Sequence, residues 1–332
     1  MFNQMGDGRL TAGLMILLSA GGLYVACLAA ITAIAPADGS KPGLRALCGW
    51  LPIVTTALCA VLLHHPEVAV AIIFGTSVAN LSLLFGLVTY LRPMQETLPR
   101  RRAWAFVLPA ALLSLVAGFG GALTWEHALM LLALGAAILG VWRDDARNRP
   151  ASAAVFQPAE PIRAQSQRWP QLALAVGLAF VAGWAAVRGT VLASQLAQMP
   201  GAALIAVSVL SPVLTLPTLR TGVILAEHGK AEDALAALVG TVLLNLCVLL
   251  PGAVLLWYVT PGGGAASVSD AVKGMPYPWG VWRIETVALV ILGSLLAPIA
   301  LGRWVLGRSE AALLVLGYAV YLASIAFSAP RA

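Results

Sequence analysis

The chain has 332 residues, of which 60% are hydrophobic and only 10% are charged, and its formal net charge is +6. Soluble domains carry about 25% charged residues, so this composition excludes a soluble protein and indicates an integral membrane protein. The apolar residues fall into blocks of about 17–25 residues, the length of a helix that crosses a bilayer core. Apolar and polar residues do not alternate within these blocks, which excludes a membrane β-barrel.

Ten such blocks follow one another, and we predict an all-α polytopic membrane protein with about ten transmembrane helices. The first block could be mistaken for a signal peptide, because "AIA" at 33–35 resembles a cleavage site. Pro36 follows directly and the apolar run is long for a signal sequence, so we interpret it as a helix. The predicted helices lie near residues 10–35, 44–63, 68–91, 104–121, 127–142, 170–188, 202–226, 234–258, 284–302 and 310–328.

Lysine and arginine are distributed unequally between the two ends of these helices. Fourteen of them follow odd-numbered helices and five lie on the opposite side, with Arg220 left out because it lies within a helix. The positive-inside rule places the fourteen, and the loop at 143–169, in the cytoplasm and both termini outside. We expect an integral protein of a bacterial inner membrane. Its expected partners are the lipid bilayer, a small ion or solute, and a further membrane protein if it belongs to a complex.

The excess of lysine and arginine over acidic residues follows from this topology and does not indicate nucleic-acid binding. The loop at 143–169 is rich in proline, alanine and glutamine, mixed in charge and nearly without aromatic residues. Proteins that bind nucleic acids carry clustered basic and aromatic residues instead. We therefore predict no nucleic-acid partner.

The cytoplasmic loop divides the helices into five and five. Consecutive halves with an odd number of helices have opposite orientations in the membrane, so this division favours an inverted repeat. We predict two inverted five-helix repeats, 1–142 and 170–332, joined by a linker at 143–169. The repeat has a fixed offset of 165 residues, which pairs Leu51-Pro52 with Leu216-Pro217, Thr56 with Thr221, Gly75-Thr76 with Gly240-Thr241, and Asn80 with Asn245.

Each half has a proline within its second helix and a Thr/Asn pair one turn apart in its third. Broken helices are tolerated inside a membrane where they line a cavity or are buried in protein. An alternative is that the prolines only kink the helices and that Thr and Asn only bond neighbouring helices. If the broken helices form a binding site, its candidate residues are Thr55, Thr56, Thr76, Asn80, Thr215, Thr218, Arg220, Thr241 and Asn245.

This arrangement resembles the cation/calcium exchanger superfamily, the membrane region of sodium/calcium exchangers. That family has two inverted repeats of five helices, with the motifs G-T-S-L-P-E and G-S-N-I-F-N, or close relatives, in each repeat. This chain reads "CGWLPI" (48–53) and "VLTLPT" (213–218) at the first motif. It reads "GTSVAN" (75–80) and "GTVLLN" (240–245) at the second. The resemblance implies a membrane transporter. No Walker A, GxSxG or HExxH motif occurs, so we do not expect an enzyme.

The chain departs from the family at the residue after each proline. In the family this residue is the glutamate that coordinates the ion, and here Ile53 and Thr218 occupy the two positions. All fourteen carboxylates, Glu285 among them, are predicted to lie in loops or at helix ends. Calcium takes about 6–8 oxygen ligands, usually with several carboxylates among them. We therefore predict no calcium transport, no metal site and no cofactor.

The four cysteines form no CxxC pair, which favours neither a metal site nor a disulfide.

Arg220 lies one turn after Pro217, and its predicted helix has no acidic residue. It could reach the cytoplasmic interface, serve as a structural charge in a cavity, or bind an anion. Our hypothesis is that Arg220 points into a cytoplasm-facing polar cavity between the second, third, seventh and eighth helices, where it disfavours divalent cations. The sequence thus predicts an exchanger-like transporter with an altered, carboxylate-free central site. The alternative is a transport-inactive scaffold or subunit of a larger complex.

Overall fold

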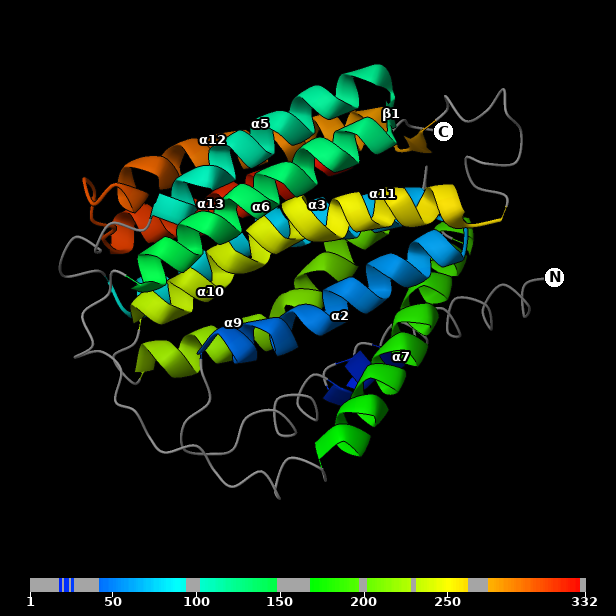
Figure 1. The fold of residues 1–332 in the computed structure, drawn as a ribbon, viewed down its shortest axis with the longest axis horizontal. Coiled ribbons are helices and arrows are strands. Elements are labelled where there is room, and N and C mark those ends of the chain that lie inside the picture. The colour runs from blue at the N-terminus through cyan, green and yellow to red at the C-terminus, as the bar shows by residue number, and fades with distance from the viewer. Residues whose placement is uncertain are drawn as a thin grey trace.

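The computed structural model describes residues 18–19, 21–23, 25–26, 42–93, 102–147, 168–196, 202–227, 231–261 and 274–328. The described chain is a bundle of helices (Figure 1). The segments η1, η6 and η7 are π-helical, and η2 and η3 are 3-10 helices. In chain order the elements are α2 (Pro42–Leu62), α3 (Pro66–Ala79), η1 (Asn80–Leu84), α4 (Phe85–Leu91), η2 (Arg102–Phe106), α5 (Val107–Ala117), η3 (Gly118–Gly120), β1 (Ala122–Leu123), α6 (Trp125–Arg147), α7 (Arg168–Leu196), α8 (Ala202–Ile205), η6 (Ala206–Leu210), α9 (Ser211–Glu227), α10 (Ala231–Leu244), η7 (Asn245–Leu249), α11 (Leu250–Val259), β2 (Met275–Pro276), α12 (Trp279–Ala300) and α13 (Arg308–Ser328).

Seven described helices are long and apolar enough to cross a membrane, and two shorter apolar helices accompany them. These nine correspond to nine of the ten predicted helices, which confirms the prediction of an all-α polytopic membrane protein. Most of the first predicted helix, at 10–35, lies outside the described residues. The seven long spans are Pro66–Leu91, Trp125–Arg143, Ala173–Leu196, Ala202–Glu227, Asp233–Val259, Trp279–Ala300 and Arg308–Ser328, and the two shorter helices are Gly49–Leu62 and Trp104–Gly120.

The two halves have their in-helix prolines and π-helical turns at corresponding positions. Pro52 lies inside α2 and Pro217 lies inside α9. The α-helices α3 and α10 each have 14 residues, and each continues into a five-residue π-helix that begins at an asparagine, Asn80 or Asn245. A π-helical turn frequently marks a functional position in a helix. The offset of 165 residues thus recurs in the backbone, while the boundaries of the two repeats and the membrane orientation stay predictions.

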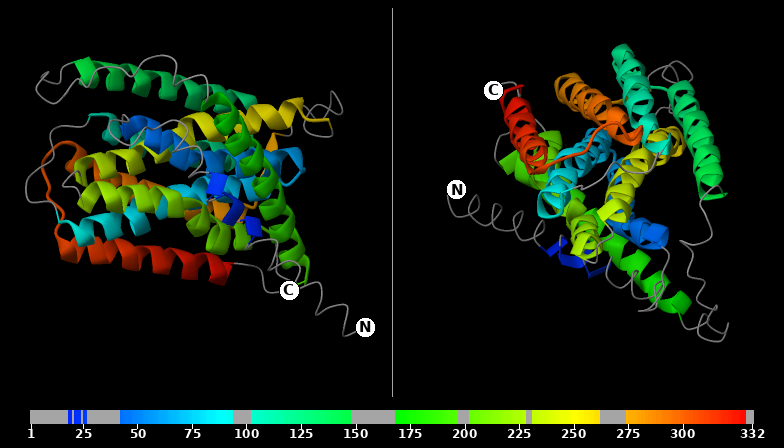
Figure 2. Two further views of the ribbon diagram at one scale, coloured as in Figure 1. Left: turned by 90° about the horizontal axis from the view of Figure 1, so that it is seen from below. Right: turned by 90° about the vertical axis from the view of Figure 1, so that its left-hand side faces the viewer.

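The proline-containing helices α2 and α9 pack together with α3 and α10 at the centre of the bundle. The helix α2 packs against α3, α9 and α10, and α3 also packs against α9. Thirteen of the fourteen residues of α3 are buried, so this helix is enclosed by protein rather than by lipid. The outer helices α13 and α6 form opposite edges of the bundle, in red and green respectively (Figure 2).

One predicted boundary is wrong in a way that matters for function. The ninth predicted helix begins at 284, but α12 begins at Trp279, directly after Pro278. Proline is well tolerated at the start of a helix, because its missing N–H has no helical partner there. Glu285 therefore lies six residues inside α12, and its side chain is 0% exposed. The prediction that every carboxylate lies in a loop or at a helix end is thus wrong for Glu285.

Candidate functional site

Asn245 connects three helices at the centre of the bundle. Trp50 in α2 donates its Nε1–H to Asn245 Oδ1 at 2.7 Å. The Nδ2 of Asn245 donates to Thr76 Oγ1 at 3.0 Å and to Ser77 Oγ at 3.1 Å, both in α3. The Asn245 side chain is 0% exposed, so these bonds replace all contact with water. Its amide is therefore a structural link between α2, α3 and η7.

Asn80 occupies the corresponding position in the first half, but its amide has no hydrogen-bond partner. Its Nδ2 and its Oδ1 are both buried and unpaired, and the residue is 0% exposed. The hydroxyl of Thr218 is also buried and unpaired. Each unpaired buried polar group costs about 1–3 kcal/mol. The central polar cluster, defined here as Thr76, Asn80, Thr218 and Asn245, thus contains polar atoms that the protein itself does not satisfy.

The other predicted threonines bond to their own helices. Thr56 Oγ1 donates to the Pro52 carbonyl at 2.7 Å, and Thr215 Oγ1 donates to the Pro212 carbonyl at 2.7 Å. This back-bonding is usual for threonine in membrane helices. These hydroxyls thus give the backbone carbonyls near the prolines a hydrogen-bond donor. Thr55, Thr76 and Thr241 bond in the same way to the carbonyls of Leu51, Ile72 and Ala237.

The two positions that the family resemblance assigns to glutamate are both buried. Ile53 is 0% exposed and Thr218 is 3% exposed. A Cβ atom on Gly49 would lie 3.3 Å from Thr218 Oγ1, so α2 and α9 are in close contact at this level. Among the described residues, Glu285 in α12 is the one buried charged side chain. The same part of the chain contains no group of three His, Cys, Asp or Glu residues arranged to hold a metal ion.

The structure separates Arg220 from the other predicted site residues. Arg220 is exposed, and it shares a helix face with Leu216 and Ile224, which are 48% and 38% exposed. Two residues along a helix correspond to a rotation of about 200°, so Arg220 and the buried Thr218 face nearly opposite directions. This exposed position does not favour the hypothesis that Arg220 points into a polar cavity between the four central helices, and the role of Arg220 stays a prediction.

The prolines adjoin an apolar cavity rather than a polar one. A cavity of about 230 Å³ lies where α2 and α9 approach the segment at 21–23. Both Pro52 and Pro217 line it, together with Gly21, Leu23, Val213, Leu214 and Leu216. The proline positions in α2 and α9 therefore face residues 21–23 of the first predicted helix on this side.

The Gly-Thr motif provides a test of how closely the two halves correspond. A Cβ atom on Gly75 would lie 2.5 Å from Ser211 Oγ, whereas the nearest neighbour of a Cβ on Gly240 is Trp142 at 3.8 Å. We expect Gly75→Ala to lower the free energy of unfolding by about 1–3 kcal/mol through overpacking. Gly240→Ala is the matched control, and alanine should stabilise that helix by up to about 1 kcal/mol. Thermal unfolding in detergent measures both changes, and equal effects would contradict the close contact at Gly75.

Comparison with known proteins agrees with this architecture. Residues 169–327 match the family described as sodium/calcium exchanger protein. No curated protein sequence matches the chain. The crystal structure of the H⁺/Ca²⁺ exchanger CAX is similar with a TM-score of 0.72 at 15% identity, over 96% of this chain and 86% of that chain. A structure of the sodium-calcium exchanger NCX_Mj is similar with a TM-score of 0.61 at 16% identity, over 95% and 99% of the two chains.

The structural likeness shows that the fold of these exchangers extends over nearly the whole chain, and the family match covers its second half. The matched family and both solved structures are described as exchangers, which agrees with the prediction of a transporter rather than an enzyme. Sequence reasoning missed Glu285, although Pro278 could have signalled the earlier start of its helix. The chain thus has the fold of these cation exchangers, and its second half matches the sodium/calcium exchanger family.

Proposed function

We propose that the protein transports a small monovalent cation through a central site built from neutral oxygens. The observation that carries the proposal is the fully buried Asn80 amide, whose two polar atoms have no partner. The unpaired Thr218 hydroxyl lies at the position that the resemblance assigns to glutamate. A cation that brings a single charge is compensated more easily by amide and hydroxyl oxygens than a divalent ion is. Calcium, with its need for carboxylates, fits this site poorly.

The burial of the cluster is compatible with transport. Asn80 and Asn245 are both 0% exposed, so their side chains are closed to water in this conformation. Transporters of this kind place the site near the membrane midplane and expose it alternately by moving one group of helices against another. A closed central site therefore agrees with an occluded intermediate.

Ion uptake into proteoliposomes tests the proposal directly. We expect saturable uptake of radioactive sodium or rubidium above that of empty liposomes. For calcium we expect no saturable component, because no carboxylate is available in the cluster to compensate its second charge. Saturable calcium uptake that disappears in Asn80→Leu would overturn the proposed selectivity.

A matched pair of variants tests the role of the Thr218 hydroxyl. Thr218 and Thr89 are both buried threonines with an unpaired Oγ1, but Thr89 lies in α4, outside the central polar cluster. We expect Thr218→Val to reduce monovalent cation uptake by about tenfold, the effect of losing roughly 1.4 kcal/mol of ligand binding. Thr89→Val should leave uptake unchanged. Equal uptake by the two variants would remove Thr218 from the site.

A transport-inactive scaffold is the second candidate function. It is favoured by Asn245, whose amide is fully used in bonds between helices. A scaffold requires such links but no ligand. Uptake of none of the tested cations by correctly folded protein would favour the scaffold and reject the transporter.

A further inference from the structure

Glu285 lies in an enclosed site between α12 and α13. Its Oε1 accepts a hydrogen bond from the Tyr321 hydroxyl at 3.4 Å, and its Oε2 has no partner. Tyr318 lies one turn before Tyr321 on α13, with the two rings 5.7 Å apart, and its hydroxyl is also buried and unpaired. A buried carboxyl, the tyrosine hydroxyl that bonds it and the adjoining Tyr318 ring therefore lie together outside the central polar cluster.

No cation compensates this carboxyl within the described part of the chain. No ion pair joins Glu285 to a described Lys, Arg or His residue. Arg283 on the same helix is exposed and, two residues away, faces a nearly opposite direction. Arg308 and Glu310 begin α13, more than ten residues before Tyr321 and so about 16 Å or more along the helix.

The remaining described helices that contact α12 bring no cation to Glu285 either. In α3 the ionisable side chain is Glu67, which pairs with His65 at 3.2 Å. The sequence of α5 contains no ionisable residue. The segment from η2 to Gly118 runs alongside α12, and a Cβ on Gly118 would contact Trp282 near the start of α12. Arg102 begins η2, sixteen residues before Gly118, so it lies toward the opposite end of α12 from Trp282.

An uncompensated buried carboxylate is strongly unfavourable, so Glu285 requires a bound cation or a proton. At most four side-chain oxygens are available here, two from Glu285 and one each from Tyr321 and the adjoining Tyr318. Metal ions such as calcium need about six to eight oxygens. A proton neutralises the carboxyl without further ligands. We infer that Glu285, Tyr318 and Tyr321 form a proton-binding site, with the proton held on Glu285 in this conformation.

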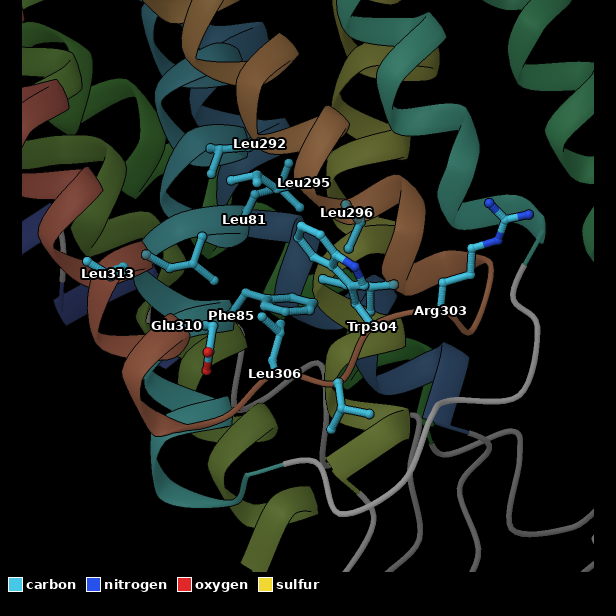
Figure 3. Close-up of a pocket in the computed structure, with 13 residues that line it drawn as sticks. Leu81, Phe85, Leu292, Leu295, Leu296, Arg303, Trp304, Leu306, Glu310 and Leu313 are labelled. Atoms are coloured by element: carbon cyan, nitrogen blue, oxygen red, sulfur yellow. The ribbon is translucent and has the colours of Figure 1, made fainter.

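Tyr321 connects this site to the surface. A cavity of about 620 Å³ between α12 and α13 is lined by Tyr321, Arg283 and Ser324 as well as by apolar residues. It shares Leu292, Leu295, Leu313 and Leu314 with a second cavity of about 560 Å³, which reaches Arg303 and Glu310. Figure 3 shows this second cavity beside the loop that joins the two helices. A continuous groove thus follows the α12–α13 contact, and a widening of this groove would bring water to Tyr321 and then to Glu285.

On the basis of the proposed function, this site supplies the proton that is exchanged for the transported cation. Glu285 is protonated in the closed bundle, because it is buried there without a cation. It ionises when α12 and α13 separate, because water then reaches the carboxyl. The proton and the cation then occupy different sites, the cation at the central polar cluster and the proton on Glu285.

Infrared spectroscopy of the purified full-length protein tests the proton site without any transport measurement. At neutral pH we expect the carbonyl stretch of a protonated carboxyl, equivalent to one group per chain, and its loss in Glu285→Gln. Glu310→Gln is the matched control, because an exposed glutamate is ionised at neutral pH and contributes no such band. The band should persist in that variant. Identical spectra for the wild type and Glu285→Gln would overturn the inference.

A second variant keeps the test decisive if Glu285→Gln fails to fold. Tyr321→Phe retains the carboxyl and removes its hydrogen-bond donor, so the band should shift in frequency and remain present. An unshifted band would reject the role of Tyr321.

In proteoliposomes, a pH gradient should accelerate cation uptake by the wild type and have no effect on Glu285→Gln. Absence of uptake in the wild type would reject the proposed transport function, while the infrared result would still decide whether Glu285 holds a proton.

Discussion

We expect Asn245→Leu to lower the free energy of unfolding by about 2–4 kcal/mol and Asn80→Leu to leave it unchanged or raise it. Asn245 makes three hydrogen bonds, to Trp50, Thr76 and Ser77. Such bonds between membrane helices contribute about 0.6 kcal/mol each. Leucine would also leave the Trp50 Nε1–H without its acceptor, at a further cost of about 1–3 kcal/mol. Asn80 makes no such bonds, so the same substitution removes two unpaired buried atoms.

Thermal unfolding in detergent micelles, followed by size-exclusion chromatography, measures this contrast. The two residues occupy corresponding positions in the two halves, so each variant is the control for the other. Under the proposed function, Asn80→Leu retains the fold and loses cation uptake, which distinguishes a ligand-binding residue from a structural one. Equal destabilisation by both variants would show that Asn80 has a structural partner.

We expect Gly118→Ala to lower the free energy of unfolding by about 3 kcal/mol, at the upper end of the range for overpacked cores. The cost arises from Trp282, because a Cβ on Gly118 would lie 2.0 Å from its Cζ2 and 2.1 Å from its Cε2. The indole is 0% exposed and lies against the rings of Phe119, Tyr277 and Trp279, so it has little room to move. Gly118 has φ −85°, which alanine also adopts, so the backbone adds no strain.

Gly120→Ala is the control for this contact, since a Cβ on Gly120 would have no neighbour within 4 Å. We expect its thermal midpoint to equal that of the wild type. Tryptophan fluorescence should shift in Gly118→Ala as the ring cluster is displaced. Unchanged stability and fluorescence in Gly118→Ala would show that the Trp282 ring can reorient without cost.

The sequence by itself determined the class of protein and the location of its irregular helices. Long apolar blocks have few stable structures other than membrane helices, because backbone groups in lipid must bond within their own segment. Nine predicted helices therefore correspond to helices in the described chain. The offset of 165 residues also identified the two asparagines at which the π-helices begin. Both inferences depend on patterns that can be read along the chain without knowing how its helices pack.

The tertiary structure decided which polar side chains are satisfied and which are not. Asn80 and Asn245 are equivalent in sequence, but Trp50 is available to Asn245, while the corresponding position in the second half is Thr215, which bonds its own helix. Glu285 was expected at a helix end and is instead enclosed by α12 and α13, whereas Arg220 is exposed on α9. The direction of a side chain depends on where its helix begins and which helix packs against each face, and these contacts join residues more than a hundred positions apart.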